Sequence, residues 1–157
     1  MRTIASLEEL ESLQGQEVAL SDWFEITQQQ VNLFAEATGD HQWIHVDVER
    51  ARRESPFGAP VAHGFLTLSL LPQFMQNAIH MEGVKMGVNY GLNRVRFTAP
   101  VPVGSRLRAR IKLLKVERLE PAPNGLVGAQ STWEVTVERE GSDRPVCVAE
   151  SISRRYS

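Results

Sequence analysis

The amino-acid sequence predicts an α+β domain in which an antiparallel sheet wraps around a long central helix. Residues 63–81 are apolar almost all round, as expected for a helix that is buried on most of its sides. Residues 106–113 and 133–138 alternate between apolar and polar or charged side chains, the period of two that is typical of half-buried strands. A buried helix and a sheet with one apolar face would cover each other's apolar surfaces.

The first sixteen residues are predicted to form a helical extension of this domain. Ser6 followed by Glu9 is a capping box, in which each residue satisfies a backbone N–H near the start of a helix, and Gly15 ends the helix. Residues 18–26 are short and mixed in character, and we interpret them as a strand.

A second helix is predicted just before a polar loop. Thr27 with Gln30 repeats the capping pattern, and Gly39 ends the helix because glycine adopts a positive φ without steric penalty. Residues 40–45 are therefore expected to form a loop that leaves the helix end. A short helix is expected around residues 48–53.

The rest of the chain predicts the buried helix and its sheet. Pro72 lies inside the apolar stretch and should kink or divide the helix. The alternation loses its phase at Leu114, which predicts a β-bulge. Strands are predicted around residues 94–99, 106–113, 133–138 and 146–152. Because such a sheet has two open edges, we expect a homodimer joined through sheet edges.

Length and composition exclude several classes of protein. A chain of 157 residues and 17.6 kDa fits one domain, residues 1–157. Its 17 basic and 19 acidic residues give a net charge of −2, which argues against nucleic-acid binding. No stretch is apolar enough for a membrane span, and no signal peptide is recognised. With Cys147 as the single cysteine no internal disulfide can form, so we expect a cytoplasmic protein.

Three further features are interpreted as structural. The strand around residues 106–113 carries a basic row that could bind phosphate, consisting of Arg106, Arg108, Arg110 and Lys112. We favour a solvated sheet face, because Glu134 and Glu138 alternate on the neighbouring predicted strand and can pair with this row. Cys147 is expected to be a core-facing thiol and not a nucleophile. His80 is expected near the C-terminal end of the apolar helix, with a structural or surface role.

The polar loop contains the first candidate for chemistry. Asp40 and His45 can converge in a loop that doubles back, with a water between the carboxylate and the imidazole. Such a pair suits general acid–base catalysis, because histidine titrates near neutral pH and a carboxylate can orient or share its proton. Alternatively, Asp40 only caps the residues that follow it, and spacing alone leaves both interpretations open. The histidines here match no metal-ligand spacing, so no metal is expected.

The start of the apolar helix is the second candidate. The backbone N–H of Gly64 has no partner within the helix and points outward, and a glycine would let an acyl carbonyl approach it closely. This is the arrangement of an oxyanion hole. Alternatively, the stretch is an ordinary helix start capped by His63. Acid–base groups next to such an N–H would suit chemistry beside a carbonyl or thioester.

The same stretches resemble the MaoC-like (R)-specific enoyl-CoA hydratases. The resemblance rests on residues 34–40 (FAEATGD), 44–47 (IHVD), 62–66 (AHGFL) and 95–104 (VRFTAPVPVG). Residues 39–45 (GDHQWIH) and 89–93 (NYGLN) resemble, more narrowly, the nodulation protein N-like branch. The resemblance extends from about residue 20 to the last strand.

The resemblance implies a hot-dog fold, a homodimer, and reversible hydration of trans-2-enoyl-CoA to (R)-3-hydroxyacyl-CoA. It implies that Asp40 and His45 are catalytic and that Gly64 and Gln42 contact the substrate. Coenzyme A would be part of the substrate, and no bound cofactor is expected. Many family members have Asn-Pro where this chain has Gln42 and Trp43, and Pro72 lies in the region where some have a serine that contacts the site.

Two alternatives to hydration remain. A thioesterase of the same fold would use a carboxylate-activated water against the thioester carbon, although the presence of both Asp40 and His45 favours hydration. A non-catalytic protein that binds acyl thioesters is the other alternative. The name of the nodulation branch refers to nodulation, a process with which the proteins are associated, and does not specify a chemical reaction.

Overall fold

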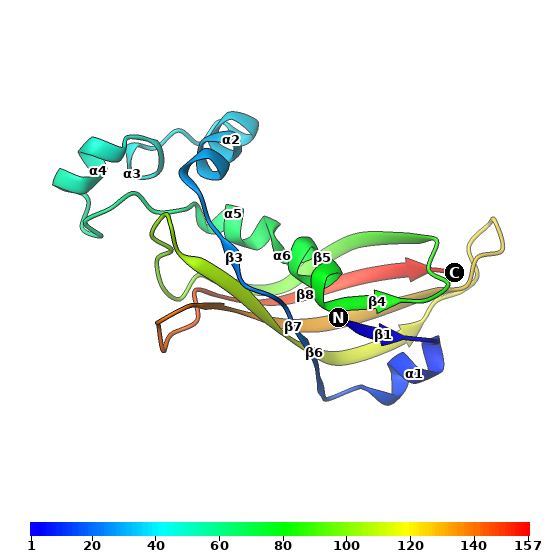
Figure 1. The fold of residues 1–157 in the computed structure, drawn as a ribbon. Coiled ribbons are helices and arrows are strands. Elements are labelled where there is room, and N and C mark those ends of the chain that lie inside the picture. The colour runs from blue at the N-terminus through cyan, green and yellow to red at the C-terminus, as the bar shows by residue number, and fades with distance from the viewer.

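A computed structural model describes all 157 residues. The core of the fold is an antiparallel sheet with the strand order β2-β6-β7-β8-β5, and β3 also pairs with β6 (Figure 1). Its strands are β2 (Glu17–Leu20), β3 (Phe24–Glu25), β5 (Met86–Arg96), β6 (Arg106–Arg118), β7 (Gly128–Arg139) and β8 (Cys147–Tyr156). The sheet curves around a helical segment, so the predicted hot-dog arrangement is confirmed.

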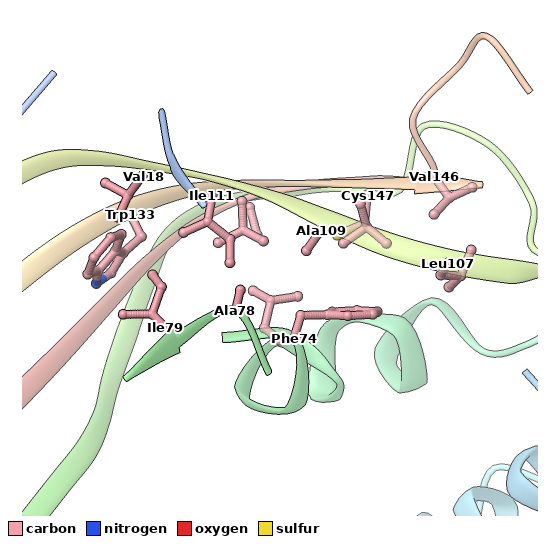
Figure 2. Packing of buried hydrophobic residues seen from close by; sticks show 14 of the residues in the cluster. Val18, Phe74, Ala78, Ile79, Leu107, Ala109, Ile111, Trp133, Val146 and Cys147 are labelled. Carbon is pink, nitrogen blue, oxygen red and sulfur yellow. The ribbon is translucent and has the colours of Figure 1, made fainter. Parts of the chain in front are cut away.

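The helical segment is divided, as Pro72 predicts. Helix α5 (Gly64–Ser69) and helix α6 (Leu71–Ala78) meet at Leu70, and Pro72 lies in the first turn of α6, where its missing N–H removes no hydrogen bond. Phe74 and Ala78 of α6 point toward Ala109 and Cys147 on the inner face of the sheet (Figure 2). Complete burial of an aromatic side chain such as Phe74 contributes about 1.5–3 kcal/mol.

The apolar stretch ends in a strand, which the sequence does not predict. Strand β4 (Ile79–Met81) pairs in parallel with β1 (Arg2–Ile4), and His80 lies opposite Thr3. His80 follows the end of α6 by two residues and is exposed, as predicted, although it lies in this short strand and not in the helix. A strand of three residues is too short to show a period of two, which is why neither β1 nor β4 is visible in the sequence.

The N-terminal segment covers one end of the core. Helix α1 (Leu7–Ser12) begins at Ser6, whose Oγ accepts a hydrogen bond from the Glu9 N–H at 3.1 Å. The Glu9 carboxylate accepts in return from the Ala5 N–H at 2.7 Å. Leu10 is buried and belongs to the same hydrophobic cluster as Phe74. The N-terminal segment is thus packed onto the domain.

Three helices lie beyond one end of the sheet (Figure 1). They are α2 (Gln28–Thr38), α3 (Trp43–Val46) and α4 (Val48–Glu54). The predicted limits of α2 are confirmed: Thr27 Oγ1 caps the Gln30 N–H at 3.2 Å, and Gly39 ends the helix with φ 81°. Residues 40–45 are not a loop throughout, because Trp43–Val46 forms the single helical turn of α3.

Strand β5 is longer than predicted and begins earlier. The sequence indicates a strand only around residues 94–99, whereas β5 covers Met86–Arg96 and the chain after Arg96 leaves the strand. Two register shifts, between Asn89 and Gly91 and between Leu92 and Arg94, interrupt the alternation on which the prediction depends. All but one of its side chains are exposed, because β5 is an edge strand.

The outer face of the sheet carries paired charges, as predicted for the basic row. Glu138 accepts from Arg108 at 2.9 Å and from Arg110 at 2.8 Å, and Arg110 also contacts Glu17 at 2.8 Å. Glu134, the other predicted partner, lies opposite Lys112 without an ion pair. The predicted bulge is confirmed by a register shift between Leu113 and Lys115.

Cys147 lies in the core, as predicted. Its side chain is fully buried, and burial raises the pKa of the thiol to about 11, so it carries no thiolate at neutral pH. No helix in the structure is both long enough and apolar enough to cross a membrane.

Candidate active site

Asp40, His45 and His63 come together from three separate segments at the end of the sheet that carries α2–α4. Because Gly39 ends α2 in the left-handed conformation, the chain reverses and places Asp40 directly after the helix. The Asp40 N–H donates to Thr38 Oγ1 at 3.4 Å, and its Oδ1 accepts from the Gln42 N–H at 3.3 Å. These local bonds hold the exposed carboxylate at the start of the polar segment.

His45 is held from two sides. The ring is only 7% exposed, and its Nδ1 lies 2.6 Å from the Val61 carbonyl oxygen. Because a carbonyl can only accept, Nδ1 must carry the proton, so Nε2 of the neutral ring presents a lone pair. The Gln28 side chain donates to the His45 carbonyl at 2.8 Å and anchors α3 to α2. The structure thus selects the tautomer in which His45 accepts a proton at Nε2.

His63 supports both candidate residues, and the sequence does not reveal this role. The ring is 2% exposed, and its Nε2–H donates to the Asp40 carbonyl oxygen at 2.9 Å. It stacks on His45 with ring centroids 3.8 Å apart and planes at 24°, while Phe34 packs against it at 4.9 Å. His63 is the N-cap residue of α5, but its side chain makes no capping hydrogen bond to the helix.

Burial lowers the pKa of His45 below its ordinary value of 6.5. A charged ring loses solvation in this position, and a nearby His63 adds repulsion when it is protonated. The Val61 carbonyl and the Asp40 carboxylate oppose this shift but do not overcome it. At neutral pH His45 is therefore uncharged and able to act as a base.

The three side chains are close enough to share one water. One polar atom from each of Asp40, His45 and His63 lies within 4.8 Å of the others. A water that forms two hydrogen bonds of about 2.8 Å can bridge such a gap. The convergence of Asp40 and His45 that was predicted for a folded-back segment is present in the structure.

The same three side chains could in principle hold a metal ion, which the sequence spacing does not predict. The ring geometry favours proton transfer instead. A histidine binds a metal through a lone pair in the plane of its ring. Two rings stacked at 3.8 Å and 24° keep these lone pairs in nearly parallel planes that are separated by the stacking distance, which is unfavourable for binding one ion between them.

Gly64 follows His63 directly and begins α5, as predicted. Its N–H donates to no protein acceptor. A Cβ built on this glycine would lie 2.7 Å from a ring carbon of Phe97, so glycine is needed here for the close approach of that ring. Packing against Phe97 therefore accounts for a glycine at position 64, without the predicted need to leave room for an acyl carbonyl. Gln42 precedes α3 with an exposed side chain that forms no hydrogen bond.

A cavity of about 680 Å³ begins one turn further along the same helical segment. Leu68 and Ser69 of α5 form part of one wall, and residues 87–92 of β5 form another. Asp40, His45 and Gly64 do not line it. The cavity leads away from the acid–base residues along the inner face of the sheet.

The lowered pKa of His45 gives a titration that can be measured. The NMR titration midpoint of the His45 ring is expected below pH 6.5, with His45→Gln identifying the resonance. Because the unfolded chain binds this proton more readily, the contribution of His45 to stability should be present above pH 6.5 and should fall as the pH drops toward the folded pKa. A midpoint at or above 6.5 would contradict the account of a desolvated neutral base.

Comparison with known proteins gives consistent matches over almost the whole chain. The model of the MaoC-like domain matches residues 9–135. The 3-hydroxyacyl-thioester dehydratase Z of Mycobacterium tuberculosis is 57% identical over 154 residues, which cover 98% of each chain. Nodulation protein N of Rhizobium leguminosarum bv. viciae is 46% identical over 154 residues, covering 94% of this chain and 89% of its own length.

The fold also matches a solved structure. Monoamine oxidase regulatory protein from Archaeoglobus fulgius superposes with a TM-score of 0.76 at 22% identity, covering 99% of this chain and 97% of the other. At this sequence identity the match shows the fold alone, whereas the family model and the two sequence relatives show to which protein family the chain belongs. The chain therefore belongs to the MaoC-like dehydratase family, in the branch that includes nodulation protein N.

Proposed function

We propose that this protein is a hydro-lyase that reversibly adds water to trans-2-enoyl-CoA and forms (R)-3-hydroxyacyl-CoA. One observation carries the proposal: the contact of His45 Nδ1 with the Val61 carbonyl leaves Nε2 as the basic nitrogen of a buried ring, and a carboxylate oxygen of Asp40 lies within 4.8 Å of a ring nitrogen of His45. The close relative named as a 3-hydroxyacyl-thioester dehydratase supports the reaction class, which is the reverse direction of the same step.

The proposed step balances with water alone. Asp40 accepts one hydrogen bond from the bound water and orients it, while His45 Nε2 removes the other proton as the oxygen bonds to C3 of the enoyl group. The C2–C3 double-bond electrons move toward the thioester and form an enolate. His45 then returns the proton to C2 on the same face, so the enzyme ends as it began. No bound cofactor is required.

The developing enolate oxygen needs a hydrogen-bond donor. The free N–H of Gly64 follows His63 directly and is the proposed donor, because an N–H aimed at developing negative charge is worth far more in a water-excluded site than in water. Gln42, exposed beside the acid–base pair, is proposed to contact the thioester. The CoA substrate and the single buried thiol fit a cytoplasmic enzyme.

One incubation separates the proposed reaction from the two alternatives. The purified protein is mixed with trans-2-butenoyl-CoA, and both the enoyl absorbance and free thiol are followed. Loss of absorbance without thiol release is expected. Thiol release would show a thioesterase, and no change in either signal would indicate a binding protein without this activity. Chiral analysis of the product is expected to give the R isomer.

We further propose that the working form is a homodimer that pairs two β5 strands. Strand β5 is at one end of the strand order and has a neighbour, β8, on one side only. Four large apolar side chains are exposed along it: Met86, Val88, Tyr90 and Leu92. An exposed apolar edge of eleven residues is an aggregation hazard unless another strand covers it.

Charge placed on this edge is expected to separate the subunits. Sedimentation equilibrium should give twice the 17.6 kDa chain mass for the wild type and a mass near one chain for the double variant Val88→Asp, Leu92→Asp. Leu33→Asp is the matched control, since Leu33 is an exposed leucine of α2 that lies outside the edge. A dimeric double variant would show that β5 is not the interface.

A further inference from the structure

A second cavity lies between the N-terminal segment and the far ends of β7 and β8. Its volume is about 250 Å³, and Leu7 and Leu10 of the N-terminal segment contribute apolar walls. The β1–β4 pair and the C-terminus lie toward the opposite end of the molecule from α2–α4, which carry the acid–base site (Figure 1). The cavity therefore lies apart from the acid–base residues Asp40 and His45, which do not line it.

An unpaired arginine lines this cavity. Arg155 of β8 lies between Gly87 and Ala129 on the two neighbouring strands, and neither of them offers a polar side chain. Its guanidinium donates no hydrogen bond to the protein, and no carboxylate oxygen lies within 4.0 Å of it. Burial lowers the pKa of this guanidinium, which has no charged partner to offset its lost solvation. Arginine stays charged at all ordinary pH values, and Glu82, which also lines the cavity, forms no ion pair with it, so this guanidinium is available to an anionic ligand.

A buried serine in the same cavity also lacks a partner. Ser131 of β7 is 1% exposed, and its Oγ forms no hydrogen bond. In the register of β7 against β8, Ser131 pairs with Ser153 and Arg155 pairs with Ala129, so Ser131 and Arg155 are diagonal neighbours. Diagonal pairs are about 7–8 Å apart, a gap that one ligand headgroup can bridge. Buried polar atoms are almost always hydrogen-bonded, so the unsatisfied Ser131 Oγ beside a half-buried arginine without a protein partner points to a ligand.

We propose that this cavity binds the carboxylate of a short aliphatic chain, with Arg155 and Ser131 holding the carboxylate oxygens and the leucines covering the chain. A guanidinium matches a carboxylate through two parallel hydrogen bonds, and the serine hydroxyl can donate a third. At ~30 Å³ for each water-sized group, the cavity of about 250 Å³ accommodates roughly eight non-hydrogen atoms, the size of hexanoate. The proposal does not depend on the hydratase activity.

The carboxylate has two possible sources. It can be a free carboxylic acid, or it can be the far end of the acyl chain of a thioester, because Arg155 also lines the cavity of about 680 Å³ that begins near the proposed active site. Competition kinetics distinguish them. Hexanoate that competes with trans-2-butenoyl-CoA and raises its KM assigns the site to the acyl chain. Hexanoate that binds without changing KM assigns it to a separate acid.

The proposal is tested with the full chain and hexanoate as the probe. Hexanoate is expected to raise the thermal midpoint and to give a binding isotherm in calorimetry, whereas hexan-1-ol, which has the same chain without the charge, should do neither at equal concentration. Arg155→Gln should weaken hexanoate binding at least tenfold, Ser131→Ala severalfold, and Arg155→Lys less than Arg155→Gln. Arg144→Gln in the exposed β7–β8 turn is the matched control and should bind as the wild type does.

Removal of an unpaired guanidinium should leave the fold intact, so Arg155→Gln without ligand is expected to melt no lower than the wild type. Three results would overturn the proposal: no binding of hexanoate by the wild type, equal binding of hexan-1-ol, or unchanged hexanoate affinity in a folded Arg155→Gln variant.

Discussion

Replacing Asp40 by Asn is expected to lower kcat/KM for hydration of trans-2-butenoyl-CoA by a factor on the order of 10² to 10⁴. The amide keeps the shape of the side chain but loses the negative charge that orients the water. The backbone carbonyl of Asp40 remains available to the His63 ring, so the fold of the segment should be preserved. The loss should appear mainly in kcat, because the charge acts on the reacting water and not on the CoA moiety.

A matched control is available in the same segment. Asp47 is also exposed, but its Oδ1 accepts from the Arg50 N–H at 3.1 Å and caps α4. Asn caps helices about as well as Asp, so Asp47→Asn should keep nearly full activity. Equal activity in Asp40→Asn and the wild type would remove Asp40 from the mechanism.

Replacing His45 by Gln is expected to have a similar effect on kcat, also on the order of 10² to 10⁴. Glutamine can still donate an N–H toward the Val61 carbonyl, but it has no basic nitrogen in place of Nε2. Stopped-flow measurement of enoyl absorbance gives the rate of the chemical step directly. The wild-type rate is expected to fall below pH 6.5 as His45 becomes protonated, and the residual rate of the variant should lack this acidic limb.

His41→Gln is the control for this variant. His41 is exposed in the same polar segment and has no side-chain hydrogen bond, so its removal should leave the rate unchanged. If His45→Gln retained the wild-type rate and pH profile, the base would have to be another group. His63 would then be the next candidate for the base, and an unchanged rate in a His63 variant would exclude it.

The position of Asp40 can be predicted from the sequence because it depends on local signals, whereas the catalytic roles of Asp40 and His45 come from the family resemblance. Thr27 and Gly39 define the two ends of α2, and Asp40 follows directly. The role of His63 was not accessible in this way. Its contacts with Asp40 and His45 join residues that are 23 and 18 positions apart in the chain, and no periodicity encodes such contacts. Only the tertiary contacts of His63, which directly precedes α5, with residues of α2 and α3 bring the two histidine rings together.

The limits of the strand predictions have a similar physical origin. Strands β6 and β7 have one buried and one solvated face, so apolar and polar residues alternate along their sequences. Strand β5 has almost no buried face in one chain, and its bulges shift the phase twice. The sequence predicts strand β8 only up to residue 152, although the strand continues to Tyr156. Beyond that point its inward-facing residues are Ser153 and Arg155, which are polar and therefore give no apolar period.

Isotope labelling tests the central claim, that the bound water attacks C3, most directly. The purified protein is incubated with trans-2-butenoyl-CoA in H₂¹⁸O, and the products are analysed by mass spectrometry and chiral chromatography. The account predicts one ¹⁸O atom in the C3 hydroxyl of (R)-3-hydroxybutanoyl-CoA, with the thioester intact. Label in a released carboxylate, or a substrate recovered without label, would contradict it.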